Sequence, residues 1–200
     1  MAEKLGFLGK TGARQSVKIP SVLKRLTAEV RQRVERVKLL ILDVDGVLTD
    51  GRLIYHDDGT ESKCFDVRDG HGIKLLQKAG IETALISGRN SPMVDKRAAD
   101  LGITTVEQGV RDKAPVLEKF LSERELKSEQ AAFVGDDLVD LPVMNRVGLA
   151  VAVAGASEHL FDTAHYVTLA PGGRGAVREV AELILAAQGV WDKVAGEYSE

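Results

Sequence analysis

Short apolar runs alternate with amphipathic segments along residues 38–190. An unbroken apolar run is typical of a strand buried on both faces of a parallel sheet, whereas apolar residues three or four positions apart are typical of a helix packed on such a sheet. We therefore predict strands at residues 38–43, 82–87, 103–107, 131–134, 149–153 and 166–169. The helices predicted between and after them cover residues 71–79, 92–102, 112–123, 141–147 and 175–188.

Glycine marks three of the changes from helix to strand. These changes occur at Gly80-Ile81, Gly102-Ile103 and Gly148-Leu149. Glycine suits the left-handed conformation that commonly ends a helix. The regular alternation predicts an α/β fold, a Rossmann-like parallel sheet with helices on both faces.

One insertion interrupts the alternation. Residues 52–56 and 62–67 read as two short strands around the turn sequence D-D-G-T, which predicts a small β-hairpin flap. About forty residues separate Asp45 from Ser87, and about twenty-five more reach Lys113. The hairpin and one helix occupy the first interval, so we expect no cap domain, which would need about 50 residues or more.

The two ends of the chain differ from the body. Residues 1–38 carry ten Lys and Arg against three Glu. We predict an N-terminal segment, 1–37, made of a basic tail and an amphipathic helix at 21–36 that is capped by Ser21 and turns its basic face to solvent. A main domain at 38–190 and a C-terminal tail at 191–200 follow, in which Trp191 is either an interface anchor or a core residue.

Composition narrows the classes of function. The net charge of −3 gives no reason to expect nucleic acid as a partner. No apolar run approaches the roughly 18 residues of a membrane span, so no membrane partner is expected. The single cysteine, Cys64, favours a reducing compartment, and we predict the cytoplasm. The basic, acid-poor N-terminus leaves an organelle transit peptide as the alternative.

Polar residues gather where predicted strands end. The sequence D-V-D-G follows the first strand, S-G-R follows the second, and G-D-D follows a later one. Because the carboxyl ends of parallel strands meet at one edge of a sheet, we expect these groups to converge there. The converging residues would be Asp43, Asp45, Ser87, Lys113, Asp136, Asp137 and Asp140.

Converging carboxylates require compensation. Two of them about 4 Å apart repel by about 4 kcal/mol at an effective dielectric constant of about 20. Either their pKa values rise or a cation lies among them. Oxygen ligands with no His or Cys nearby favour Mg²⁺ over Zn²⁺, and Mg²⁺ keeps positions open for water and phosphate oxygens. The predicted cofactor is therefore Mg²⁺.

These motifs resemble the four signature motifs of the haloacid dehalogenase superfamily of phosphotransferases. Residues 38–190 are, more closely, similar to the family of 3-deoxy-D-manno-octulosonate 8-phosphate phosphatases. The stretches that carry the closer likeness are F-D-V-R-D-G-H-G (65–72), V-G-D-D-L-V-D (134–140) and G-G-R-G-A-V-R-E (172–179).

The resemblance implies roles for the converging residues. Asp43 would be the nucleophile that becomes an aspartyl phosphate, and Asp45 the general acid and then the base. Ser87 and Lys113 would hold the phosphoryl oxygens. The carboxylates of Asp43 and Asp136 and the backbone carbonyl of Asp45 would bind Mg²⁺. The residues implied to support the metal's waters and the lysine are Asp137 and Asp140.

The resemblance also implies a substrate and an assembly. The substrate would be a phosphorylated sugar acid of the lipopolysaccharide core pathway, and the protein a homotetramer in which a neighbour completes each site. The loop 172–175, with Arg174, could reach a neighbouring site or be an ordinary loop before a helix. The substrate-binding residues implied are Asp45, Asp66, Val67, Arg68, Asp69, Gly70, Lys74, Arg89, Arg97 and Lys113.

Two alternatives stay open at this point. One is a phosphatase of a nine-carbon sugar-acid phosphate, either 2-keto-3-deoxynonulosonate 9-phosphate or an acylneuraminate 9-phosphate. The other is a non-catalytic oligomerising module. The complete set of acidic and basic residues argues against the module, because a protein without catalysis gains nothing from a costly acidic pocket.

Overall fold

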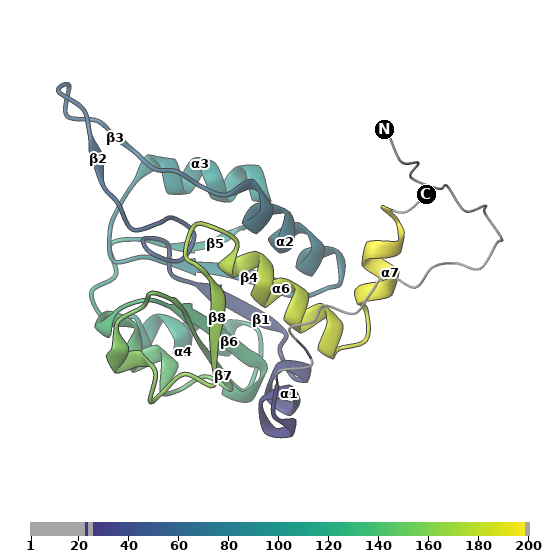
Figure 1. Cartoon of the computed structure of the whole chain (residues 1–200). Helices are drawn as coiled ribbons and strands as arrows, with labels where there is room; N and C mark the ends of the chain where they lie inside the picture. Colours follow the sequence, from purple (N-terminus) through teal and green to yellow (C-terminus); the bar gives the residue numbers. More distant parts are fainter. Residues whose placement is uncertain (1–22, 24–25, 199–200) are drawn as a thin grey trace, which may run out of the picture.

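A six-stranded parallel sheet forms the centre of the molecule in the computed structural model, which describes residue 23 and residues 26–198 (Figure 1). The strand order is β5-β4-β1-β6-β7-β8, and every neighbouring pair is parallel. The strands are β1 (Leu39–Leu42), β4 (Glu82–Ile86), β5 (Thr105–Glu107), β6 (Ala131–Gly135), β7 (Leu149–Ala154) and β8 (Tyr166–Pro171). A separate two-stranded hairpin consists of β2 (Ile54–Tyr55) and β3 (Glu61–Ser62).

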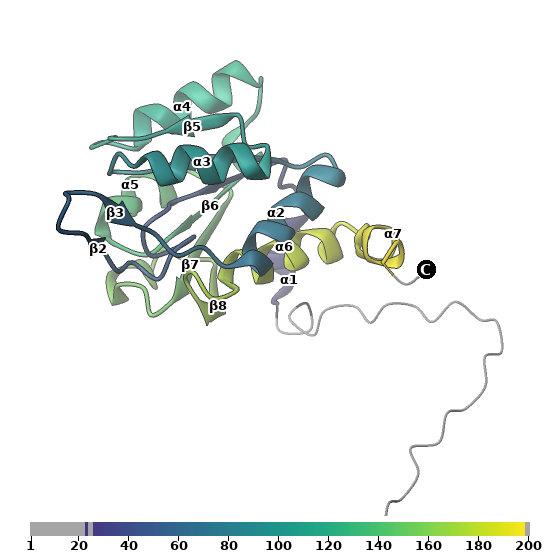
Figure 2. The same cartoon turned by 90° about the horizontal axis from the view of Figure 1, so that it is seen from above.

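Helices cover both faces of the sheet, as predicted (Figure 2). Helices α2 and α6 pack against each other on one face, and α4 and α5 lie on the other. The α-helices are α1 (Ala28–Glu35), α2 (Val67–Lys78), α3 (Pro92–Leu101), α4 (Ala114–Glu123), α5 (Leu141–Met144), α6 (Ala176–Ala187) and α7 (Trp191–Gly196). The described chain also contains the 3₁₀ turns η2 (Ser128–Gln130), η3 (Leu138–Asp140) and η4 (Glu158–Leu160).

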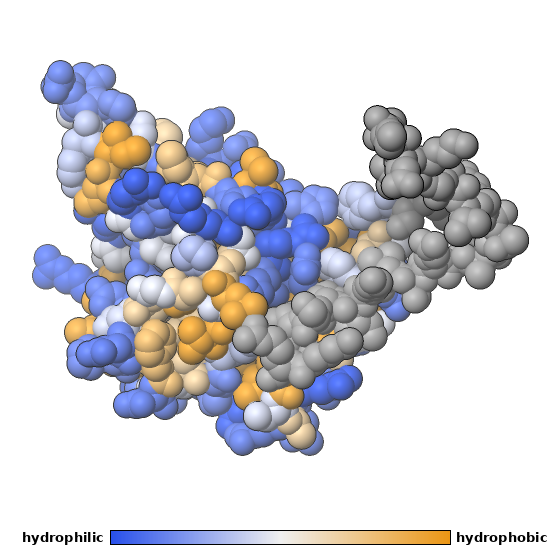
Figure 3. Space-filling view, viewed as in Figure 1, coloured by the Kyte–Doolittle hydropathy of each residue, from blue (hydrophilic) through white to orange (hydrophobic). Residues whose placement is uncertain are grey.

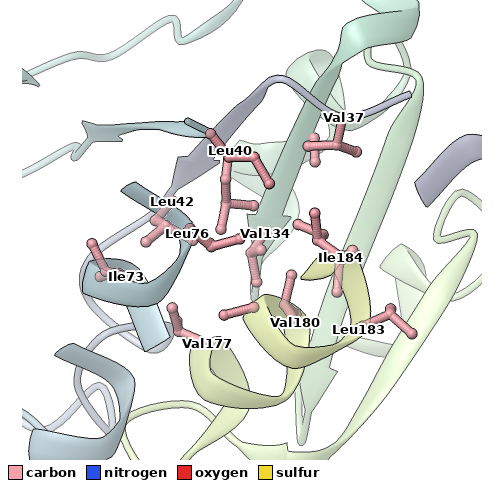
Figure 4. Close-up of a cluster of buried hydrophobic side chains, with 14 of the residues drawn as sticks. Val37, Leu40, Leu42, Ile73, Leu76, Val134, Val177, Val180, Leu183 and Ile184 are labelled. Atoms are coloured by element: carbon pink, nitrogen blue, oxygen red, sulfur yellow. The ribbon is translucent and has the colours of Figure 1, made fainter. Parts of the chain in front are cut away.

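The central strand β1 is buried on both sides. Leu40 and Leu42 point into the apolar cluster formed with α2 and α6 (Figure 4). Leu39 and Ile41 point into the cluster formed with α4 and α5. Burial of each such side chain stabilises the fold by about 1.5–3 kcal/mol, so β1 is firmly held where it ends at Asp43.

The direction in which strands are added reverses at β1. The chain leaves β1 for β4 and β5 on one side and then returns to add β6, β7 and β8 on the other. Ligands of open α/β sheets bind outside the carboxyl ends of the strands at such a reversal. Asp43 follows β1 and Asp136 follows the neighbouring β6, so both lie at this position.

The hairpin and the following helix differ from the prediction in their bounds. The hairpin strands are two residues each, and α2 begins at Val67 rather than at His71. Asp66 caps the helix by accepting a hydrogen bond from the backbone nitrogen of Arg68. The glycines at 70 and 72 disfavour helix when sequence alone is considered, but tertiary packing overrides this preference. A Cβ at Gly72 would lie 3.0 Å from the Cα of Arg178, so glycine allows α2 and α6 to approach closely.

The two ends of the described chain also refine the prediction. Helix α1 begins at Ala28, capped by the Thr27 side chain, whereas the predicted cap Ser21 lies outside the described residues. The segment after residue 190, predicted as a tail, begins with α7, and Trp191 is a core residue. Within the described chain, no helix combines the length and the apolar character needed to span a bilayer.

The hairpin stands away from the body, and no cap domain lies between Asp45 and Ser87 in the described chain (Figures 1 and 2). The predicted fold class, including the flap, is therefore confirmed.

Candidate active site

A buried lysine links two carboxylates at the carboxyl edge of the sheet. The Nζ atom of Lys113, at the start of α4, lies 2.6 Å from Oδ1 of Asp43 and 2.7 Å from Oδ1 of Asp140. All three side chains are at least nine-tenths buried. Removal of one partner from a buried pair leaves an uncompensated charge, so this trio depends on all its members.

Asp140 also shapes the loop that carries Asp136. Its Oδ2 accepts hydrogen bonds from the backbone nitrogens of Asp136, at 2.9 Å, and Asp137, at 3.3 Å. A Cβ at Gly135 would lie 2.5 Å from the same oxygen, which explains the glycine before the two aspartates. Asp137 is exposed and accepts a hydrogen bond from the backbone nitrogen of Leu138.

Gly46 lets the Asp136 side chain approach the loop after β1. A Cβ at Gly46 would lie 2.0 Å from Oδ2 of Asp136, and the φ angle of Gly46 is +101°. Both the close approach and the positive φ require glycine. The hydroxyl of Thr49 fixes this loop by accepting from the backbone nitrogens of Gly46 and Gly51.

Two carboxyl groups in the site have raised pKa values. Burial raises the pKa of Asp43 to about 6, against the opposing effect of Lys113. Burial, followed by the charges of Asp43 and Asp140, raises the pKa of Asp136 to about 8. The metal-free site therefore disfavours its own negative charge at neutral pH.

The same residues fit a divalent cation. Carboxylate oxygens of Asp43, Asp136 and Asp140 all lie within 4.8 Å of one another. Asp140 uses both oxygens for Lys113 and for backbone nitrogens, whereas the Asp136 carboxylate accepts no hydrogen bond from the described residues. The hard-oxygen donor set suits Mg²⁺, and Asp43 and Asp136 have oxygen atoms left to bind it. The part in metal binding predicted for the Asp45 carbonyl stays a prediction.

Ser87 follows β4, the other neighbour of β1. Its side chain is buried, and its hydroxyl accepts a hydrogen bond from the backbone nitrogen of Arg89 at 3.2 Å. Because β4 pairs in parallel with β1, Ser87 lies at the same edge as Asp43.

Two residues at Asp45 were not predicted from the sequence. Lys63, just after β3, donates a hydrogen bond to Oδ1 of Asp45, and its side chain is 1% exposed. Glu61 accepts a hydrogen bond from Nη2 of Arg89 at 3.1 Å. Nε of Arg89 lies 4.0 Å from Oδ2 of Asp45. A possible signal was the E-S-K spacing, since residues two apart on a strand share one face.

The predicted substrate-binding residues do not all meet at this site. Arg89 lies beside Asp45, as described above. The carboxylate of Asp69 is buried and accepts hydrogen bonds from the backbone nitrogens of Gly175, at 3.2 Å, and Arg178, at 2.8 Å, so it caps helix α6. Burial raises the pKa of Asp69, and these backbone hydrogen bonds oppose the rise.

The remaining predicted residues lie along α2 and α3. Arg97 donates a hydrogen bond to the carbonyl of Asp66 at 3.1 Å, and a Cβ at Gly70 would collide with its guanidinium. Val67 and Lys74 are exposed on α2. These positions are separate from the Lys113 trio, and their contact with substrate stays a prediction.

Arg68 lines a surface pocket of about 730 Å³. Its guanidinium pairs with Asp66 at 2.6 Å and donates to the carbonyl of Arg174 at 3.0 Å. Arg174, on the loop 172–175, pairs with Asp50 at 3.4 Å. The pocket thus lies between the base of the hairpin and this loop.

The sequence is similar to that of known phosphatases. A family profile described as haloacid dehalogenase-like hydrolase matches residues 106–178. The chain is 48% identical over 172 residues to the 3-deoxy-D-manno-octulosonate 8-phosphate phosphatase KdsC of Escherichia coli (strain B / BL21-DE3), across 86% of this chain and 92% of the relative.

Solved structures extend this likeness to three dimensions. The 3-deoxy-D-manno-octulosonate 8-phosphate phosphatase from Yersinia pestis aligns with a TM-score of 0.81 and 48% identity, covering 82% of this chain and 89% of that chain. The enzyme from Moraxella catarrhalis, in complex with a magnesium ion, a phosphate ion and a KDO molecule, aligns with a TM-score of 0.84 and 41% identity, covering 85% and 98%. The chain therefore belongs to the family of 3-deoxy-D-manno-octulosonate 8-phosphate phosphatases, among the haloacid dehalogenase-like hydrolases.

Proposed function

We propose that the protein is a Mg²⁺-dependent phosphatase that hydrolyses 3-deoxy-D-manno-octulosonate 8-phosphate to the free sugar acid and phosphate, for lipopolysaccharide core biosynthesis. The observation that carries the proposal is the buried trio of Asp43, Lys113 and Asp140 beside Asp136, at the carboxyl edge of β1 and β6. The likeness to the KdsC relatives covers the whole of this region.

Asp43 and Asp45 divide the chemistry. An oxygen of Asp43 forms a bond to phosphorus while the bond from phosphorus to the sugar oxygen breaks, and Asp45 gives that oxygen a proton. Water then forms a bond to phosphorus, Asp45 takes the proton from the water, and the bond from phosphorus to Asp43 breaks. Both carboxyl groups return to their starting state.

The surrounding residues orient these groups and balance their charge. Lys113 holds Oδ1 of Asp43 at 2.6 Å, which fixes the nucleophile, and its ammonium can also bind a phosphoryl oxygen. Ser87, at the same edge, offers its hydroxyl to another phosphoryl oxygen. Asp140 holds Lys113 in place, at 2.7 Å.

Asp43 and Asp136 would hold the magnesium ion, with the backbone carbonyl of Asp45. When bound, Mg²⁺ supplies positive charge that favours the ionised carboxylates and the developing charge on the phosphoryl oxygens. Asp137 lies beside Asp136 and can orient water at the ion.

The proposed compartment is the cytoplasm, since the single cysteine favours a reducing environment. The proposed assembly is a homotetramer, in which a neighbouring copy would complete the open site. Leu53, Ile54 and Tyr55 on the hairpin are large and exposed, and Figure 3 shows apolar side chains gathered there and over β8. Exposed apolar groups of this kind mark contact surfaces. Light scattering should report four copies per particle; a monomer with full activity would refute this part.

Steady-state phosphate release is the test of the proposed substrate. The eight-carbon and nine-carbon sugar-acid phosphates are compared with Mg²⁺ and then with EDTA. We expect a strong preference for the eight-carbon ester that EDTA abolishes. A preference for the nine-carbon ester would keep the mechanism and change the substrate. If the wild type releases phosphate from neither ester and Asp43→Asn behaves in the same way, the protein is the non-catalytic module.

A further inference from the structure

Lys63 brings a buried positive charge from the hairpin segment to the proposed acid and base. Its side chain is 1% exposed, although the residue follows the two-residue strand β3 of an outlying hairpin. Its ammonium donates a hydrogen bond to Oδ1 of Asp45. Burial of a lysine is costly unless its charge is paired, so this contact fixes both side chains.

The two oxygens of Asp45 have different surroundings. Oδ1 is occupied by Lys63. Oδ2 is buried and has no hydrogen-bond partner within the described residues. An acceptor that is buried and unpaired is rare in folded proteins and calls for an explanation. Oδ2 is therefore the oxygen of Asp45 that remains available to a further hydrogen-bond partner.

A second ion pair holds Lys63 and Arg89 near each other. Glu61 accepts from Nη2 of Arg89 at 3.1 Å, and its Oε1 lies 3.9 Å from Nζ of Lys63. Arg89 in turn lies 4.0 Å from Oδ2 of Asp45. The cluster thus consists of two basic and two acidic side chains, and it joins the hairpin segment to the edge of the sheet.

We infer that Lys63 is a positioning residue for Asp45, an inference that rests on the proposed function. By holding Oδ1, it fixes the carboxyl group in one orientation and leaves Oδ2 to exchange the proton with the leaving sugar oxygen. Glu61 supports this arrangement from the hairpin through Arg89 and Lys63. Orientation of this kind matters most when the reaction needs a proton transfer.

A comparison of substrates with poor and good leaving groups distinguishes a positioning role of Lys63 from a merely structural one. The sugar oxygen of an alkyl phosphate leaves poorly without a proton, whereas p-nitrophenolate leaves readily without one. The value of kcat/KM reports the steps up to release of the first product, which includes proton transfer to the leaving oxygen. Loss of orientation at Asp45 should therefore lower kcat/KM for the alkyl ester much more than for p-nitrophenyl phosphate.

The experiment measures kcat/KM on both esters for the full-length wild type, Lys63→Met and Lys63→Arg, in saturating Mg²⁺. For Lys63→Met we expect a loss of about 10- to 100-fold on the sugar-acid phosphate and less than about threefold on p-nitrophenyl phosphate. Lys63→Arg, which keeps the charge, should recover most of the loss. The control is Lys119→Met, because Lys119 also pairs with a carboxylate, that of Glu107 at 2.7 Å, but is 54% exposed.

An equal loss on both esters, or no loss on either, would overturn the inference. If Lys63→Met does not fold, the ratio of the two losses for Lys63→Gln decides in the same way. A wild-type protein that releases phosphate from neither ester would instead overturn the proposed function, and the inference with it. If the wild type is active and Lys63→Met has the same ratio of kcat/KM for the two esters as the wild type, only the role of Lys63 is refuted.

Discussion

The Asp136 carboxylate opposes folding of the metal-free protein at neutral pH, so Asp136→Asn should raise its free energy of unfolding. The side chain is partly buried, lies among like charges, and accepts no hydrogen bond from the described residues. Asparagine has nearly the same shape and no charge, and its amide can donate a hydrogen bond to a neighbouring carboxylate.

The size of the effect follows from the pKa of Asp136. Burial and the neighbouring carboxylates raise that pKa from 3.8 to about 8. At pH 7 the Asp136 carboxyl group keeps its proton in the folded state and has lost it in the unfolded state. The free energy of unfolding therefore falls by about 1.4 kcal/mol for each of the roughly three pH units between the unfolded pKa and pH 7, or by about 4 kcal/mol. Solvent screening of a partly exposed group lowers this value, and we expect a gain of about 2 kcal/mol.

The sign of the pH dependence is fixed by the direction of this shift. Because the folded state binds the proton more tightly, wild-type stability in EDTA should fall as the pH rises from about 4 to about 8. Asp136→Asn should flatten this fall, and the two proteins should differ little near pH 4, where both states of the wild type carry the proton.

Urea unfolding in EDTA at several pH values measures the effect, with Asp137→Asn as the control. Asp137 undergoes the same chemical change but is exposed, and asparagine can keep its hydrogen bond with Leu138. Mg²⁺ at about 100 times its Kd should stabilise the wild type by about 2.7 kcal/mol and should not stabilise Asp136→Asn. A lower free energy of unfolding for Asp136→Asn than for the wild type, in EDTA at pH 7, would refute the proposed burden of the Asp136 charge.

Two further predictions test the packing of the site. Lys113→Met should abolish activity and lower the free energy of unfolding by about 3–5 kcal/mol, because Asp43 and Asp140 lose their shared cation; a loss below about 1 kcal/mol in urea unfolding would contradict this. Gly172→Ala should lower the free energy of unfolding by about 1–3 kcal/mol and displace the loop after β1, because its Cβ would lie 1.6 Å from the carbonyl oxygen of Gly46. Gly196→Ala, where the described chain leaves room for a Cβ, should leave activity and stability near wild type, and equal effects at both glycines would count against the steric argument.

The sheet and most of the site could be predicted because one rule connects them. Apolar runs place the strands, and parallel strands bring the residues after them to one edge. Asp43, Lys113, Asp136 and Asp140 therefore meet as expected, although they are far apart in sequence.

Contacts that depend on the exact path of a loop could not be predicted. The pairing of Lys63 with Asp45 depends on how the chain returns from the hairpin to the sheet edge. The E-S-K spacing places Glu61 and Lys63 on one face but does not indicate which residue they meet. The start of α2 at Val67 was not predicted, because Gly70 and Gly72 disfavour helix in the sequence. In the structure these glycines allow α2 to pack closely on α3 and α6. Asp69 is predicted to bind substrate by resemblance, yet its carboxylate caps α6, which only the tertiary structure reveals.

The aspartyl-phosphate intermediate would be observed directly by finding the phosphoryl group on the protein. A reaction with the eight-carbon sugar-acid phosphate is quenched in acid during turnover, digested, and analysed by mass spectrometry. We expect one added phosphoryl group on Asp43, which should be absent from Asp43→Asn and absent without Mg²⁺. Rapid phosphate release with no phosphorylated peptide, or with the phosphoryl group on another residue, would contradict it.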